Sequence, residues 1–261
     1  MSKFDYRDAF DHLFPEGRGR VNACHTCCDR HAGDPGRVAL RYGTTDGTVR
    51  DITFAELVVQ AAKLAEVFAR RGVGKGDRIA GLLPRTPELL ITILATWRLG
   101  CVYQPLFTAF GPKAVGQRVR DAGTRILVTD AANRAKAADV ADLCTIVTVS
   151  AGSGGTDLDF WAASEAMPGG AVPVPCDAED PFLIMFTSGT TGPAKPLLVP
   201  IKAIVAFVGY MRDAVDLRPD DRFWNIADPG WAYGLYYAVT GPLAMGHATC
   251  LVPAFGGAGL T

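Results

Sequence analysis

The sequence predicts an α/β fold in which mostly parallel sheets are flanked by helices. Amphipathic helical stretches alternate with short apolar runs along the chain, and glycine or proline separates the two kinds of segment. The apolar runs are continuous, which is typical of strands buried on both faces, as parallel strands are. Alternation of such strands with helices indicates a sheet covered by helices on both sides.

Helices are indicated by start signals and by apolar residues three or four positions apart. The first follows Thr53, which has the spacing of a capping box with Glu56. The second has an N-cap at Thr86 and then Pro87, the residue best suited to a first helical position. The expected helices are, in chain order, 53–72, 86–100, 131–143, 160–166, 201–215 and one before the last strand.

Strands are indicated by short runs of apolar and β-branched residues between turn signals. The run 79–83, for example, follows a glycine turn at 74–77 and ends at Pro84. The expected strands are 79–83, 101–103, 125–129, 145–149, 182–186, 223–226 and a last one that ends at Val252. Glycine- and proline-rich patches at 151–156 and 168–175 mark a candidate subdomain seam at about 151–181.

Composition narrows the class of partner. The chain of 261 residues is 49% hydrophobic and carries a formal net charge of -1, so nothing favours nucleic acid or an anionic membrane as partner. Residues 229–261 contain no Asp, Glu, Lys or Arg, but Gly241 and Pro242 interrupt them, so we expect buried core there and no membrane span. No signal peptide is recognisable at the start, which predicts a cytoplasmic protein with its seven cysteines reduced.

A cluster of thiols and imidazoles at 24–31 allows two interpretations. Its spacing could supply zinc ligands, but no second pair of ligands follows to complete a tetrahedral shell. Val21, Cys24, Cys28 and His31 instead fall on one stripe of a helix, where a free cysteine behaves as a small hydrophobic residue. We therefore expect core packing here and no metal site.

The run 182–186 leads directly into hydroxyls, glycines and one lysine. Glycines allow successive backbone N–H groups to point inward, and a lysine adds a positive charge, so this segment suits phosphate oxygens. The spacing differs from a Walker A loop, and the structural alternative is a polar surface turn between a strand and a helix. The candidate phosphate-binding residues are Thr187, Ser188, Gly189, Thr190, Thr191, Gly192 and Lys195.

These residues, read as Phe186 to Gly192 followed by Lys195, resemble the phosphate-loop signature of the adenylate-forming, AMP-binding acyl-CoA synthetase family. Other segments resemble its acetyl-CoA-synthetase-like members. They are 28–31, 83–88, 97–112, 228–231 and 241–246. The resemblance covers about 22–252 and implies the N-terminal part of the large domain of an adenylate-forming enzyme.

The resemblance implies an ATP-dependent acid-thiol ligase. A short- or medium-chain carboxylate would attack Mg²⁺-bound ATP to give an acyl-adenylate, and coenzyme A would then displace AMP. The loop from Thr187 to Lys195 would hold the β- and γ-phosphates. Trp231 is the candidate for the acyl pocket, and the alternative is a core aromatic at the start of an apolar helix.

Two departures from the family pattern matter. Family members usually have proline before the loop lysine and glycine after it, whereas this chain has Ala194 and Pro196, so a backbone donor is lost beside Lys195. The family's magnesium-associated glutamate, adenylation lysine and C-terminal lid domain lie beyond Thr261. We therefore expect 1–261 to be the N-terminal portion of an AMP-binding domain, truncated and lacking part of the catalytic set, with the apolar surface at 229–261 exposed.

Two alternatives to a ligase fit this truncation. One is a non-catalytic nucleotide- or acyl-binding module, and the other is one half of a split ligase that is complemented by a separate C-terminal chain.

Overall fold

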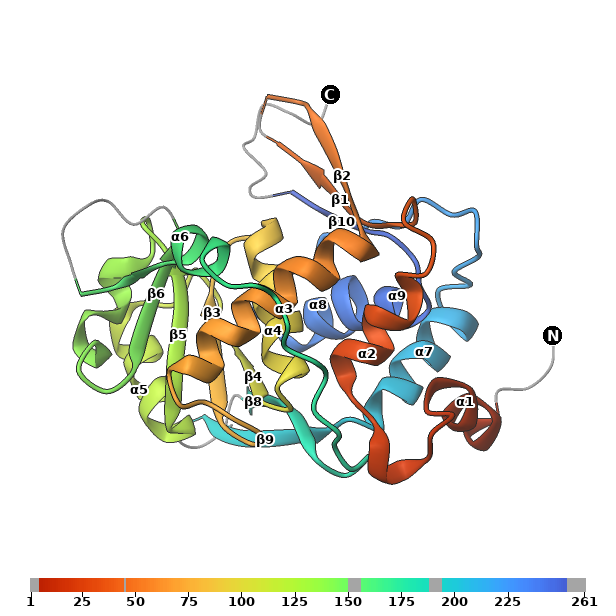
Figure 1. The fold of residues 1–261 in the computed structure, drawn as a ribbon, viewed down its shortest axis with the longest axis horizontal. Helices are drawn as coiled ribbons and strands as arrows, with labels where there is room; N and C mark the ends of the chain where they lie inside the picture. Colours follow the sequence, from red (N-terminus) through yellow and green to blue (C-terminus); the bar gives the residue numbers. More distant parts are fainter. Residues whose placement is uncertain (1–4, 45, 150–155, 188–193, 253–261) are drawn as a thin grey trace.

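A computed structural model describes residues 5–44, 46–149, 156–187 and 194–252. A seven-stranded sheet forms its centre, and all neighbouring strands are parallel except the last pair (Figure 1). In spatial order the strands are β7 (Leu158–Asp159), β6 (Thr145–Val149), β5 (Thr124–Asp130), β3 (Arg78–Leu82), β4 (Val102–Pro105), β8 (Pro181–Thr187) and β9 (Lys195–Pro200).

A second, three-stranded sheet lies at the top of Figure 1. Its central strand β1 (Val38–Gly43) pairs with β2 (Val49–Thr53) in antiparallel fashion. On its other side β1 pairs in parallel with β10 (Thr249–Leu251), which lies more than two hundred residues later in the chain. The second sheet therefore joins the two ends of the described chain.

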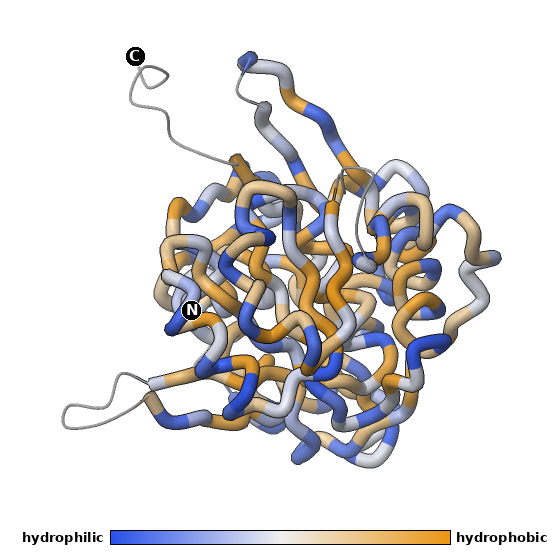
Figure 2. The backbone as a smooth tube through the Cα atoms, turned by 90° about the vertical axis from the view of Figure 1, so that its left-hand side faces the viewer, coloured by the Kyte–Doolittle hydropathy of each residue, from blue (hydrophilic) through white to orange (hydrophobic). Residues whose placement is uncertain are grey.

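Different helices cover the two faces of the large sheet. On one face α3 (Phe54–Arg70) and α4 (Pro87–Arg98) share a core with Ile79 and Ile126. On the other face α5 (Pro112–Ala122) and the 3₁₀ segment η3 (Arg134–Val140) pack against Ala80 and Leu127. Hydrophobic residues are concentrated on the inner strands and helices (Figure 2). The predicted α/β fold with a mostly parallel sheet flanked by helices is confirmed.

The remaining helices are α1 (Tyr6–Leu13), η1 (Arg18–Arg20), α2 (Ala23–Cys27), η2 (Asp29–His31), α6 (Phe160–Glu165), α7 (Ala203–Asp213), α8 (Ala232–Gly234), the π-helical turn η4 (Leu235–Thr240) and α9 (Gly241–Ala244). Some of them pack against α3 or α4, as α2, η2 and α6 do, while α7, η4 and α9 pack with one another. Within the described ranges, no helix has both the length and the apolar character needed to cross a membrane.

Local signals predicted the helix starts well. Thr53 caps α3, with its hydroxyl accepting from the Glu56 N–H and the Glu56 carboxylate accepting from the Thr53 N–H, so the capping box is confirmed. Pro87 begins α4 as expected, although the Thr86 side chain makes no capping bond. The buried core expected after Pro229 is confirmed for Leu235, Ala238, Val239 and Leu243, which are fully buried, but not for Trp231 and Tyr233, which are exposed. Residues 253–261 lie outside the described ranges.

Three expectations about secondary structure are wrong. Residues 223–226 are not a strand, and Trp224 and Ile226 are 42% and 66% exposed. The helix expected at 131–143 is reduced to the 3₁₀ segment η3. Strand β9 was not expected. It contains Pro196 and Pro200, and it forms because it is the edge of the sheet, where a missing N–H is tolerated.

The cysteine cluster is part of the core, as expected. Cys24, Cys27 and Cys28 are completely buried, and burial raises the pKa of all three thiols. The expectation of one continuous helical stripe is wrong, because the backbone leaves the helical region at Cys28 and a single 3₁₀ turn follows. All seven cysteines are free thiols.

Candidate active site

The candidate site lies at the carboxyl ends of the parallel strands. Strands β3, β4 and β5 end at Leu82, Pro105 and Asp130, and β8 runs in the same direction to Thr187. In open α/β sheets ligands bind in the crevice beyond this edge. The loops that follow these four strands are therefore the natural place for substrate-binding residues.

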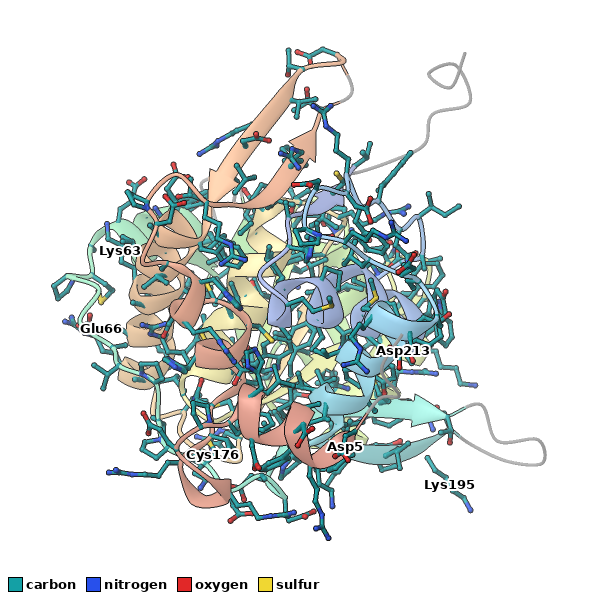
Figure 3. All side chains as sticks on the ribbon, turned by 90° about the vertical axis from the view of Figure 1, so that its right-hand side faces the viewer. Asp5, Lys63, Glu66, Cys176, Lys195 and Asp213 are labelled. Atoms are coloured by element: carbon teal, nitrogen blue, oxygen red, sulfur yellow. The ribbon has the colours of Figure 1, made fainter. Side chains whose placement is uncertain are left out.

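The candidate phosphate loop connects β8 to β9. Thr187 pairs with Lys195 across the antiparallel pair, and both residues are exposed. The Lys195 side chain points outward at the end of β9 (Figure 3). The other candidates in the loop, which are Ser188, Gly189, Thr190, Thr191 and Gly192, lie outside the described residues. Strand β9, and not a helix, follows this segment. The phosphate-binding role of the segment stays a prediction.

Three aromatic side chains form a wall beside this edge. The Trp231 ring centroid lies 5.7 Å from that of Phe107 and 5.4 Å from that of Phe110, and the two phenylalanines are 5.8 Å apart. Both phenylalanines belong to the loop that follows β4. Trp231 is 43% exposed, so one side of its ring packs and the other is open. The alternative of a buried core aromatic is therefore wrong for Trp231.

Arg118 of α5 joins the aromatic wall to the phosphate loop. Its guanidinium carbon lies 4.3 Å from the Phe110 ring centroid and 5.6 Å from that of Phe186. Phe186 is the residue immediately before Thr187, so the wall and the start of the loop are neighbours in space. Burial lowers the pKa of Arg118 from its ordinary value. Cation–π contacts of a partly desolvated guanidinium are worth about 1–2 kcal/mol.

A tight turn places Trp231 in this wall. The Asp228 carboxylate accepts from the Gly230 N–H at 2.7 Å, and the Asp228 carbonyl accepts from the Trp231 N–H at 3.0 Å. A Cβ atom at Gly230 would lie 2.7 Å from the Phe107 Cα, so the turn touches the Phe107 backbone. The turn therefore positions the indole against the loop that follows β4.

The loops after β4 and β5 are also tied together. The Lys136 ammonium donates to the Thr108 carbonyl and, at 2.7 Å, to the Asn133 side-chain oxygen. The Asp130 carboxylate in turn accepts from the Asn133 N–H at 2.9 Å. These bonds hold the loop that carries Phe107 and Phe110 in place from the β5 side.

Sequence reasoning found only part of this arrangement. The sequence pointed to Thr187, Lys195 and Trp231. In the structure the Trp231 ring contacts Phe110, and Arg118 contacts both Phe110 and Phe186. Phe107 and Phe110 lay inside a segment that carried the family resemblance, so that signal could have named them. No sequence pattern indicated Arg118 as a site residue, because the sequence of a helix does not show which aromatic rings one of its side chains will contact.

The arrangement suits a molecule with an anionic end and an apolar end. Thr187 and Lys195, both exposed, offer a hydroxyl and a positive charge where β8 ends and β9 begins. The exposed face of Trp231, backed by Phe107 and Phe110, offers an apolar surface a short distance away.

Comparison with known proteins gives the family of the chain. The family model described as AMP-binding enzyme matches residues 28–257. Acetyl-coenzyme A synthetase 2 of Candida glabrata is 33% identical over 264 residues, which are 88% of this chain and 37% of that protein. An acetyl-coenzyme A synthetase of Methylobacterium radiotolerans is 31% identical over 257 residues, covering 89% of this chain and 40% of that protein.

Among solved structures, an acyl-CoA synthetase of Brucella canis superimposes with a TM-score of 0.91 at 48% identity. The match covers 97% of this chain and 46% of that one, so the chain spans less than half the length of these relatives. The family model covers most of the chain, and the fold and the sequence agree with it. The chain therefore belongs to the family of AMP-binding enzymes.

Proposed function

We propose that this chain is the N-terminal portion of an AMP-forming acyl-CoA synthetase that activates a short- or medium-chain carboxylate. Membership of the AMP-binding family and the names of the relatives support this proposal. The observation that carries it is the series of contacts Phe186–Arg118–Phe110–Trp231, which links the residue that we propose for the acyl surface to the residue before the proposed phosphate loop. We infer a cytoplasmic location, where free thiols stay reduced.

The proposed reaction has two steps. A carboxylate oxygen attacks the α-phosphorus of ATP, and pyrophosphate leaves with the electron pair of the broken P–O bond. The coenzyme A thiolate then attacks the acyl carbon, and AMP leaves with the acyl–oxygen bonding pair. In the first step Thr187, Lys195 and the loop between them hold the β- and γ-phosphates, while Trp231 contacts the acyl chain. Catalysis of this kind depends on positioning and charge stabilisation.

Mg²⁺ enters this proposal as the counterion of ATP. Among the described residues there is no group of three or more His, Cys, Asp and Glu side chains that could hold a metal ion. No step of the reaction is assigned to a metal ligand of these residues. We propose that residues 1–261 form part of the AMP-binding domain, with a subdomain seam at about 151–181, and that the remaining catalytic groups belong to a lid domain outside it.

The test is carboxylate-dependent release of pyrophosphate by the natural protein that contains this chain. We expect saturable release with a short- or medium-chain acid and formation of the CoA thioester when coenzyme A is added. ATP binding without pyrophosphate release would favour a non-catalytic binding module. Release only after mixing with a separate C-terminal chain would favour a split ligase.

Lys195→Met is expected to lower kcat/KM for ATP about 100-fold, equivalent to about 2.7 kcal/mol of transition-state stabilisation. The reason is that the ammonium neutralises charge that develops on the leaving pyrophosphate, which a methionine of similar length cannot do. Steady-state kinetics at varied ATP concentration measures this change. The control is Lys63→Met on α3, which lies on the opposite side of the molecule in Figure 3. Equal effects of the two substitutions would contradict the role of Lys195.

Pro196→Gly is expected to tighten ATP binding several-fold. Pro196 pairs with Phe186 on the edge strand and has no N–H, so glycine restores a donor beside Lys195. Calorimetric titration with ATP measures the affinity. Pro200→Gly at the other end of β9 is the matched control, because it loosens the same strand away from the loop. Unchanged or weaker binding in Pro196→Gly would show that the loop tolerates or requires the proline.

A further inference from the structure

One buried hydroxyl near the candidate acyl surface has no role in the proposed reaction. Tyr103 lies in β4, between Ile79 of β3 and Leu183 of β8. Its side chain is completely buried, and its hydroxyl has no hydrogen-bond partner among the described residues. A buried polar group without a partner is unfavourable, and phenylalanine would fill the same space without that cost.

The hydroxyl points toward the carboxyl edge of the sheet. A Cβ atom at Gly81 would lie 2.3 Å from the Tyr103 hydroxyl oxygen and 3.1 Å from its ring carbons. Gly81 pairs with Pro105, two residues beyond Tyr103 in the direction of that edge. The tyrosine ring therefore runs along β4 toward the loop that carries Phe107, and the absence of a side chain at Gly81 leaves room for its oxygen.

The charged group that acts on this hydroxyl belongs to the turn that holds Trp231. Burial chiefly, and the Asp228 carboxylate in addition, raise the pKa of the Tyr103 hydroxyl. One Asp228 carboxylate oxygen accepts from the Gly230 N–H at 2.7 Å. Among the hydrogen bonds between described residues, the other oxygen accepts none, so it can take a further donor. A protonated tyrosine hydroxyl is such a donor.

The Asp228–Trp231 turn is supported on two sides by backbone. Gly230 touches the Phe107 backbone, and a Cβ atom at Gly234 would lie 2.2 Å from the Asp228 carbonyl oxygen. The Trp231 ring is open on its other side, where the acyl chain is proposed to pack. The contact of Gly230 with Phe107 brings this turn to the loop after β4, toward which the Tyr103 hydroxyl points.

We propose that Tyr103 is a positioning residue of the acyl site, whose hydroxyl donates a hydrogen bond to the Asp228 carboxylate when the carboxylate substrate is bound. The bond holds the Asp228–Trp231 turn against Phe107 and so fixes the indole against the acyl chain. This role rests on the proposed function of the site. It predicts that loss of the hydroxyl changes the KM for the carboxylate and leaves the KM for ATP unchanged.

Tyr103→Phe in the natural protein is the first test. We expect the KM for the carboxylate to rise about tenfold, equivalent to about 1.4 kcal/mol, while the KM for ATP and the thermal midpoint stay unchanged. Asp228→Asn is expected to raise the same KM by a similar factor, and the double variant by no more than either single one. Tyr6→Phe on α1 is the control for loss of a hydroxyl elsewhere. The inference would be overturned if Tyr103→Phe raised both KM values equally or changed neither. It would also be overturned if the effects of Tyr103→Phe and Asp228→Asn on the KM for the carboxylate were additive.

A second measurement does not depend on turnover. In a background in which every tryptophan of the natural protein except Trp97 and Trp231 is replaced by phenylalanine, acrylamide quenching reports mainly on Trp231, since Trp97 is buried. We expect octanoate to protect the Trp231 fluorescence in this background and to protect it less when Tyr103→Phe is added. Absence of both pyrophosphate release and protection in the parent overturns the proposed function and this inference with it. An active parent whose Tyr103→Phe variant behaves identically overturns the inference alone.

Discussion

Gly234→Ala is expected to lower the free energy of unfolding by roughly 3 kcal/mol or more. A Cβ atom at position 234 would lie 2.2 Å from the Asp228 carbonyl oxygen, 2.4 Å from the Asp228 carbonyl carbon and 2.8 Å from the Pro229 nitrogen. All three are backbone atoms of a turn that is also pressed against Phe107, so none can move aside cheaply. Relief of the clash requires the turn to shift, and Trp231 shifts with it.

Urea denaturation measures the stability of the Gly234→Ala variant, and carboxylate-dependent activity measures the displacement of Trp231. The matched control is Gly33→Ala, because an added Cβ there meets nothing within 4 Å and its φ is ordinary. We expect the control to lie within about 0.5 kcal/mol of the parent. A Gly234→Ala protein as stable and active as that control would show that the turn adapts, which contradicts its proposed role in holding the indole.

Arg98→Met is expected to cost about 3–5 kcal/mol of unfolding free energy. The Arg98 guanidinium donates to the Asp29 carboxylate at 2.9 Å, and the two side chains are 6% and 14% exposed. It also donates to the Ala171 carbonyl at 2.6 Å and the Cys24 sulfur at 3.3 Å. Methionine fills much of the same volume but leaves the Asp29 charge buried without its partner.

The double variant Arg98→Met with Asp29→Leu separates charge from packing. It removes both charges, so we expect most of the lost stability to return, although the Ala171 carbonyl still lacks its donor. Arg70→Met is the control, since Arg70 pairs with Glu66 at the surface of α3, and its loss is expected to cost about 0.5 kcal/mol or less. If the double variant were as unstable as Arg98→Met alone, packing and not the buried charge would explain the loss.

Some features of the fold could be read from short stretches of chain. The capping box at Thr53 and Glu56 involves residues three positions apart, so the local sequence contains all of the required groups. The same holds for Pro87 at the start of α4. Strands β3, β5, β6 and β8 are continuous apolar runs, because parallel strands are buried on both faces by helices from elsewhere in the chain.

Other features depend on position in the finished sheet. Two prolines made 195–200 a poor candidate for a strand, and only its place at the edge, beside β8, makes those prolines harmless. Residues 223–226 have apolar and aromatic character but meet no neighbouring strand among the described residues, so they remain irregular. Hydrogen-bonding partners of a strand come from distant segments, which a local pattern does not contain.

The candidate site divides in the same way. The sequence by itself determined the α/β class, the family, the phosphate-loop residues from Thr187 to Lys195 and Trp231 as candidates, because each depends on a contiguous motif. Only the tertiary structure brought Trp231 to Phe107 and Phe110, and joined Phe110 through Arg118 to Phe186. These contacts link segments that are far apart in the chain, and they exist because the carboxyl ends of neighbouring parallel strands meet at one edge of the sheet.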